Sequence, residues 1–129
     1  MLTSGLSLPF YIDNLYSGLA KVDGLLKLTG ESLVIEFQTQ DNVIGMFKGS
    51  SKTKQVPLNQ VFKAEIKTRW WDRSITIRPS TLSAIDGIPG VDKGQLKIKF
   101  RKADQEIAKN IVSQLNLRLS EIRLQELDE

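Results

Sequence analysis

The residue types that carry most enzyme chemistry are missing from this chain of 129 residues. It contains no histidine and no cysteine, so the commonest general base, the thiolate nucleophile and the usual zinc ligands are absent. Carboxylates such as Asp86 and Asp92 fall in a stretch rich in glycine and proline, where solvated acids are the ordinary outcome. The sequence therefore predicts no catalytic residue, no metal site and no cofactor, and it favours a binding role over an enzymatic one.

A cluster typical of binding surfaces lies at Arg69-Trp70-Trp71-Asp72-Arg73. Tryptophan and arginine are enriched at interface hot spots, and a guanidinium can stack on an exposed indole. Adjacent strand residues point to opposite faces, so one ring would be exposed if the other filled the core. Two interpretations stay open: one ring anchors a partner, or both rings pack, one inside and one under the following loop. The candidate partner-binding residues are Lys67, Arg69, Trp70, Trp71 and Arg73.

Charge is distributed unevenly along the chain, although the net charge is only +3. From residue 48 to 78 there are eight basic and two acidic residues, whereas from residue 103 onward three basic residues face six acidic ones. Such polarity permits head-to-tail self-association or an anionic partner at one end, while solvated strand and helix faces are the plainer interpretation. The candidate anion-binding residues are Lys48, Lys52 and Lys54.

Hydrophobic periodicity predicts a series of strands followed by one helix. Alternating apolar residues indicate strands at 19–28, 33–38, 61–68, 74–78 and 96–101, and Phe62, Ala64, Ile66 and Thr68 are expected to share an inward face. A short strand at 43–47 is expected to stop at Gly49-Ser50-Ser51, and extended structure resumes at 53–58, with Pro57 at an edge or a strand end. The Trp70-Trp71 pair is expected at or near a hairpin tip.

The remaining segments complete the predicted organisation. Residues 79–94 are expected to form a long loop with one helical turn around 82–85, and apolar residues spaced by three and four predict an amphipathic helix at 103–127. Leu117 and Leu124 fall off its apolar stripe, which leaves a second contact surface open. We expect one domain, 1–129, with an N-terminal extension at 1–18 that packs on a β-barrel at 19–101, and a capping helix at 103–127.

The order of these elements resembles that of bacterial pleckstrin-homology-like (PH-like) domains. The resemblance covers about residues 19–122, and it rests on the step Val56-Pro57-Leu58-Asn59-Gln60-Val61, the Trp70-Trp71 hairpin, the final strand and the closing helix. It implies a mainly β fold with a C-terminal α-helix, a PH-like barrel of two near-orthogonal antiparallel sheets capped by one helix. Members of the wider superfamily bind phosphoinositides, peptides or protein surfaces, and bacterial members sometimes form oligomers.

The phosphoinositide role of this superfamily does not carry over to the first hairpin. That role depends on a basic cluster that holds inositol phosphates through charge-assisted hydrogen bonds. Here only Lys27 precedes the turn at 28–32, Glu31 adds an unfavourable charge, and no arginine follows on the second strand.

Together these observations predict a non-enzymatic binding or scaffold module that acts by protein–protein interaction or self-assembly. The alternative is peripheral binding to an anionic membrane surface through the basic 48–78 region, which would weaken steeply with salt. Nucleic acid fits less well because the helix is acidic, and no small-molecule substrate is expected. The absence of cysteine, of a signal-peptide pattern and of an apolar run near ~20 residues predicts a cytoplasmic protein, peripheral at most at a membrane.

Overall fold

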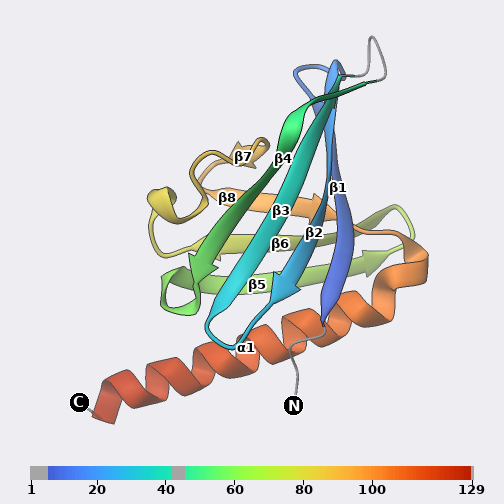
Figure 1. Ribbon diagram of the computed structural model, residues 1–129. Coiled ribbons are helices and arrows are strands. Elements are labelled where there is room, and N and C mark those ends of the chain that lie inside the picture. Colours follow the sequence, from blue (N-terminus) through green and yellow to red (C-terminus); the bar gives the residue numbers. More distant parts are fainter. Residues whose placement is uncertain (1–5, 42–45, 129) are drawn as a thin grey trace.

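The computed structural model describes residues 6–41 and 46–128, in which strands are followed by one long helix (Figure 1). The strands are β1 Ser7–Leu15, β2 Ala20–Leu28, β3 Ser32–Asp41, β4 Met46–Pro57, β5 Val61–Arg69, β6 Asp72–Pro79, β7 Val91–Asp92 and β8 Gln95–Lys99. Short 3₁₀ helices lie at Leu58–Gln60 (η2), Leu82–Ile85 (η3) and Lys102–Asp104 (η4), and the helix α1 spans Gln105–Asp128. The expected mainly β chain with a C-terminal helix is thus confirmed.

All strand pairs are antiparallel and follow the order β4-β3-β2-β1-β8-β6-β5, with β7 paired to β8. Strands β1 to β4 form one layer, and β5, β6 and β8 form a second layer that crosses it (Figure 1). The two layers are joined by the pairing of Tyr11 with Lys99. Strands β4 and β5 end the order, so the sheet is not closed.

The core lies between the two layers and the helix. The alternation expected for β2, β3, β6 and β8 is confirmed, because the apolar residues of one face of each strand are buried. Phe10 and Phe100 are among the largest fully buried side chains. The helix contributes its own buried stripe, Ala108, Ile111, Val112, Leu115 and Leu119.

The N-terminal segment differs from its expected role as an extension. Ser7–Leu15 is strand β1, which pairs with β2 along its length and contacts β8, so it lies in the middle of the strand order. Leu8, Phe10 and Ile12 alternate into the core. The intervening Pro9 obscured this period of two, although proline removes only one backbone donor from a strand. Residues 1–5 lie outside the described part.

Strand β4 also differs from expectation. The predicted strand at 43–47 falls partly outside the described residues, but from Met46 the chain runs as one strand of 12 residues to Pro57 without stopping at Gly49-Ser50-Ser51. The register between β3 and β4 shifts between Phe37 and Thr39. The two strands remain paired on both sides of this shift. The placement of Pro57 at the end of an edge strand is confirmed.

Strand β5 has a register shift between Val61 and Lys63, and this shift changes which of its residues point inward. Val61 and Ala64 are buried, whereas Phe62, expected inside, is 54% exposed and lies beneath the Arg123 guanidinium at 5.4 Å. Thr68, also expected inside, is exposed near the strand end. An irregularity of one residue moves a side chain to the other face.

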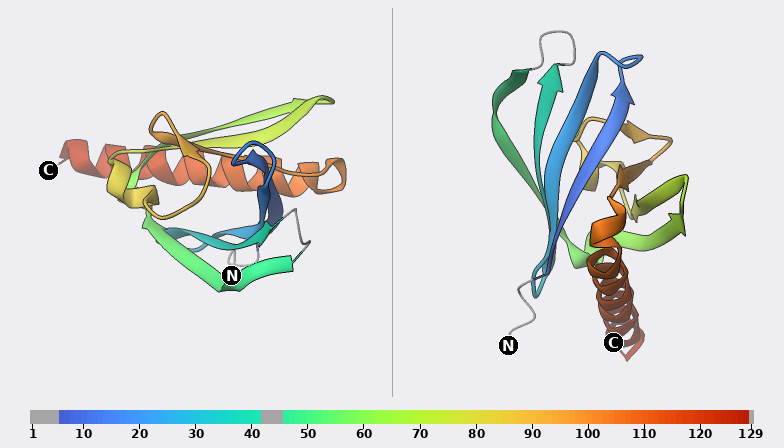
Figure 2. Two further views of the ribbon diagram at one scale, coloured as in Figure 1. Left: turned by 90° about the horizontal axis from the view of Figure 1, so that it is seen from above. Right: turned by 90° about the vertical axis from the view of Figure 1, so that its right-hand side faces the viewer.

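The last elements follow the prediction closely. The loop between β6 and β8 contains the expected turn, η3, and buries Ala84, Ile85 and Ile88. Helix α1 lies across β5 and the beginning of β1, and its C-terminal end extends past the strands (Figures 1 and 2). Within the described ranges, no helix combines the length and the apolar character that crossing a bilayer requires.

Candidate functional site

The Trp70-Trp71 pair forms the two-residue turn that connects β5 to β6, so its expected place at a hairpin tip is confirmed. Trp70 is 78% exposed and Trp71 is 64% exposed, and the two rings meet edge to face with centroids 5.5 Å apart. Arg69 places its guanidinium 5.8 Å from the centre of the Trp71 ring. We call Arg69, Trp70, Trp71 and Arg73 the Trp turn.

The interpretation in which both rings pack is wrong, and so is the premise that one ring fills the core, whereas anchoring of a partner by an exposed ring stays a prediction. Both interpretations assumed that the tryptophans lie within a strand, where successive side chains alternate. Because the pair is the turn itself, neither ring reaches the core, and the following loop covers neither of them. Each ring, left in water, lacks the stabilisation on the order of 3 kcal/mol that burial in the core would give it.

The Trp turn is fixed to the start of the helix. Arg73 donates from Nε to Gln105 Oε1 at 3.2 Å and from Nη1 to the Trp70 carbonyl at 3.2 Å. The backbone N–H of Phe100 donates to the Arg73 carbonyl at 3.1 Å. Arg73 is therefore a structural support of the turn, whereas Arg69 and the two rings face outward. A turn held in this way presents its rings with little conformational freedom left to lose on binding.

Asp72 lies at the base of the Trp turn, and its carboxylate contacts two nearby lysines. Its carboxylate accepts from the Ser74 hydroxyl at 2.8 Å and from Lys97 Nζ at 3.4 Å, and Lys67 Nζ lies 3.9 Å away. Burial alone would raise the pKa of Asp72, but the Ser74 hydrogen bond and the two ammonium groups outweigh burial and hold the pKa below its ordinary value. Lys67, one of the predicted site residues, thus neutralises a neighbouring carboxylate.

The outer face of β5, β6 and β8 carries a group of cations that the sequence only partly indicated. Register places Ser74 of β6 between Lys67 of β5 and Lys99 of β8, and it places Thr76 between Glu65 and Lys97 in the next row. We call this surface the basic face; its cations are Lys63, Lys67, Arg78, Lys97 and Lys99.

Three carboxylates partly compensate these five cations, which leaves the basic face at +2 (5 − 3). Glu65 contacts Lys63 at 3.2 Å and Arg78 at 3.9 Å, Asp72 contacts Lys67 and Lys97, and Asp13 lies 3.1 Å from Lys99. The outward alternation of β8 was visible in the sequence. Its pairing with β6, which places Lys97 and Lys99 on the same outer face as the cations of β5, was not.

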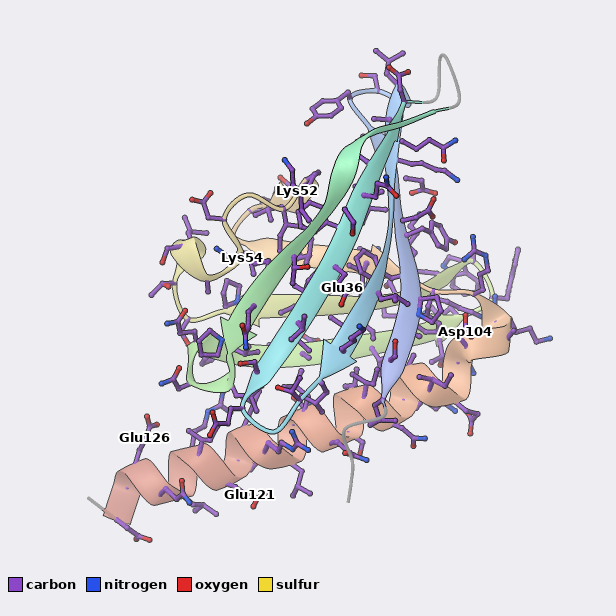
Figure 3. All side chains as sticks on the ribbon, in the orientation of Figure 1. Glu36, Lys52, Lys54, Asp104, Glu121 and Glu126 are labelled. Carbon is purple, nitrogen blue, oxygen red and sulfur yellow. The ribbon has the colours of Figure 1, made fainter. Side chains whose placement is uncertain are left out.

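The predicted anion-binding lysines do not join this group. They belong to β4, at the opposite end of the strand order from β5. Lys52 pairs with Phe37 and Lys54 pairs with Ile35, so both lysines emerge on the core-facing side of the edge strand. Figure 3 shows them on the side of β4 turned toward the loop after β6. The side chain of Lys48 lies outside the described part.

A further hollow, which the sequence analysis missed, lies where the β2–β3 turn approaches the second half of α1. It has a volume of about 530 Å³ and is lined by Glu31, Leu58 and Ile122 among others, and an adjoining hollow is lined by Arg118, Glu121 and Gln125 among others. We call this the acidic groove. Ile122 belonged to the predicted apolar stripe, but only tertiary structure brings residues 30–32 and 57–59 beside it.

Within the described residues, no three His, Cys, Asp or Glu side chains lie close enough together to hold a metal ion. Comparison of the chain with known proteins found no matching family model, no matching curated protein and no matching solved structure.

Proposed function

We propose that this chain is a non-enzymatic binding module that docks on a protein surface through the Trp turn. The observation that carries the proposal is the exposure of both indoles on a turn that Arg73 fixes to the helix. Indole rings with a neighbouring guanidinium are the side chains most enriched at binding hot spots. Because the turn is braced, little ordering opposes association.

The strand order supports a related proposal about the fold. What supports this proposal is a layer of β1 to β4, a second layer of β5, β6 and β8 that crosses it, and a C-terminal helix, although the sheet is not closed into a barrel. We infer that the chain is a PH-like domain without a lipid-binding role for its β2–β3 hairpin, which the sequence alone indicated as the first hairpin. In that hairpin Lys27 Nζ lies 2.7 Å from Glu36 Oε2, which leaves little positive charge for an anionic headgroup.

The test compares the wild-type chain with a Trp70→Ala/Trp71→Ala variant as immobilised bait for proteins of the source cell. We expect at least one protein to be retained by the wild type and lost by the variant. Tyr16→Ala is the matched control, because Tyr16 is 70% exposed on a different turn. Equal retention by wild type and the double variant would sink the proposal.

The basic face gives a second candidate function, docking on an anionic membrane surface. Its cations form a continuous outer surface, and the Trp turn at its end offers rings suited to the interfacial region of a bilayer. Sedimentation with phosphatidylcholine vesicles, with and without phosphatidylserine, tests this function. We expect a Lys97→Glu/Lys99→Glu variant to lose binding to the anionic vesicles, while Lys52→Glu/Lys54→Glu, the same change of charge on β4, retains it. Failure of the wild type to sediment with anionic vesicles would exclude this candidate.

A further inference from the structure

The acidic groove has the chemical character that complements the Trp turn. Its floor is apolar, formed by Leu58, which is buried, and by Ile122, which is partly buried against the core. Glu31 and Glu121 are exposed at its margins, and the exposed Leu124 lies one helical turn beyond Glu121. An apolar floor with acidic margins suits an aromatic ring accompanied by a cation.

Arg118 also lines the adjoining hollow, so two carboxylates and one guanidinium leave the groove at −1 (1 − 2). Arg118 donates to the Thr29 carbonyl, and Arg123 donates to the Phe62 carbonyl while it covers the Phe62 ring. Among the described residues, neither Glu31 nor Glu121 belongs to an ion pair. Glu126 projects farther along the helix near its C-terminal end (Figure 3). The groove therefore offers carboxylates to an incoming cation.

The two complementary surfaces cannot meet within one molecule. Arg73 of the Trp turn is hydrogen-bonded to Gln105 in the first turn of α1, while the groove surrounds Ile122. Those positions are 17 residues apart on a continuous helix, a separation of about 25 Å. Figure 1 shows the β5–β6 turn and the C-terminal end of the helix at opposite sides of the molecule.

We infer that the Trp turn of one copy of this chain docks in the acidic groove of a second copy. This inference rests on the proposed function and names its partner. An indole would cover Leu58 and Ile122, and Arg69 would face Glu31 or Glu121. The contact joins two different surfaces, so a bound pair still presents a free groove on one copy and a free turn on the other, and the assembly grows head to tail.

Two variants that each disable one surface test this arrangement. Trp70→Ala/Trp71→Ala keeps the groove and loses the turn, whereas Glu31→Arg/Glu121→Arg keeps the turn and reverses the charge of the groove. All four positions are exposed, so both variants should fold, and circular dichroism checks this. In analytical ultracentrifugation we expect the wild type to form larger species as its concentration rises, and each variant alone to associate roughly 30-fold or more weakly.

The decisive sample is an equimolar mixture of the two variants. The intact turn of one fits the intact groove of the other, so we expect a one-to-one dimer that does not grow further. Arg69→Ala, which leaves both rings in place and adds no negative charge, is a second turn-deficient variant and should behave in the same way in the mixture. A mixture that stays monomeric, or a wild type that is monomeric at about 1 mM, overturns the inference.

The failure of this inference can be told apart from the failure of the proposed function. If the wild type does not self-associate but still retains a cellular protein through Trp70 and Trp71, the Trp turn is a docking site for another protein and the second copy is excluded. If the turn variant alone assembles as strongly as the wild type, the contact does not use the Trp turn, and the inference also falls.

Discussion

At the scale of single residues, Gly24 lies where β2, β3 and the Phe10 ring meet. A Cβ at this position would come within 2.2 Å of the Glu36 carbonyl oxygen and within 2.6 Å of the Phe10 Cζ. Both atoms belong to well-packed parts of the sheet, so neither can retreat without disturbing its neighbours. The period of two in β2 puts Gly24 on the same face as Val22 and Leu26, but alternation alone does not reveal the contact that requires glycine.

We predict that Gly24→Ala lowers the free energy of unfolding by about 2–3 kcal/mol, because the new methyl group overpacks this contact. Gly30→Ala is the matched control. Nothing lies within 4 Å of a Cβ at that position and its φ is not positive, so its effect should stay within about 0.5 kcal/mol. Urea unfolding followed by circular dichroism measures both. Equal midpoints for the two variants would contradict the packing argument.

Asp72 makes a pH-dependent contribution to stability. Its pKa in the folded protein is lower than the ordinary value of 3.8. The stabilisation is therefore fully present above that ordinary value and is lost as the pH falls through the lower, folded pKa. Replacement by asparagine removes the charge but keeps an acceptor for the Ser74 hydroxyl, which isolates the electrostatic part.

We predict that Asp72→Asn is less stable than the wild type by up to about 1 kcal/mol near pH 7, because Lys67 and Lys97 lose their partner. The difference should shrink at acid pH, below 3.8, as the wild-type carboxyl becomes protonated as well. Urea titrations at neutral and at acid pH measure it. A difference of the same size at both would show that the charge of Asp72 is not responsible.

At the scale of elements, strands with a clear period of two were predictable, whereas local irregularities were not. The alternation of β2, β3 and β8 and the spacing of the helix are properties of the sequence alone. Phe62 was misplaced because a register shift in β5 depends on what its partner strand does. The exposure of both Trp70 and Trp71 followed from the length of a turn, which the alternation of the flanking strands does not set.

In helix α1, the spacing of apolar residues predicted which side chains are buried. Leu119 is buried against the strands and Leu117 is 61% exposed, as the predicted apolar stripe implied. We predict that Leu119→Ala lowers the free energy of unfolding by about 2–4 kcal/mol, because the substitution leaves a cavity. Leu117→Ala should change it by less than about 0.5 kcal/mol. Thermal and urea unfolding compare the two, and a Leu117→Ala effect as large as that of Leu119→Ala would show that α1 is rotated.

At the scale of the whole molecule, the layer of β1 to β4 is not supported evenly along its length. Its far end rises beyond the second layer and the helix (Figure 2). Core residues of β3 are Leu33, Ile35 and Phe37, whereas residues 38–41 are only half-buried. Free energies of local opening follow the density of such buried contacts.

We therefore predict that the backbone amides of residues 38–41 exchange with deuterium at least about tenfold faster than those of residues 33–37, although both segments belong to one strand. Hydrogen–deuterium exchange followed by NMR measures the two groups within one sample, so each serves as the control for the other. Uniform protection along β3 would mean that the far end is supported as firmly as the near end.

The two ends of the strand order are shielded by different means. Along β5, the Asn116 amide donates to the Ala64 carbonyl at 3.1 Å and Arg123 donates to the Phe62 carbonyl, so the helix occupies backbone acceptors. Along β4, a strand added at the edge would have to cover Lys52 and Lys54, which emerge on the core-facing side. Ordered growth by strand addition, the route to amyloid-like aggregates, is thus opposed at both edges, and the chain can reach high local concentrations without its sheets fusing.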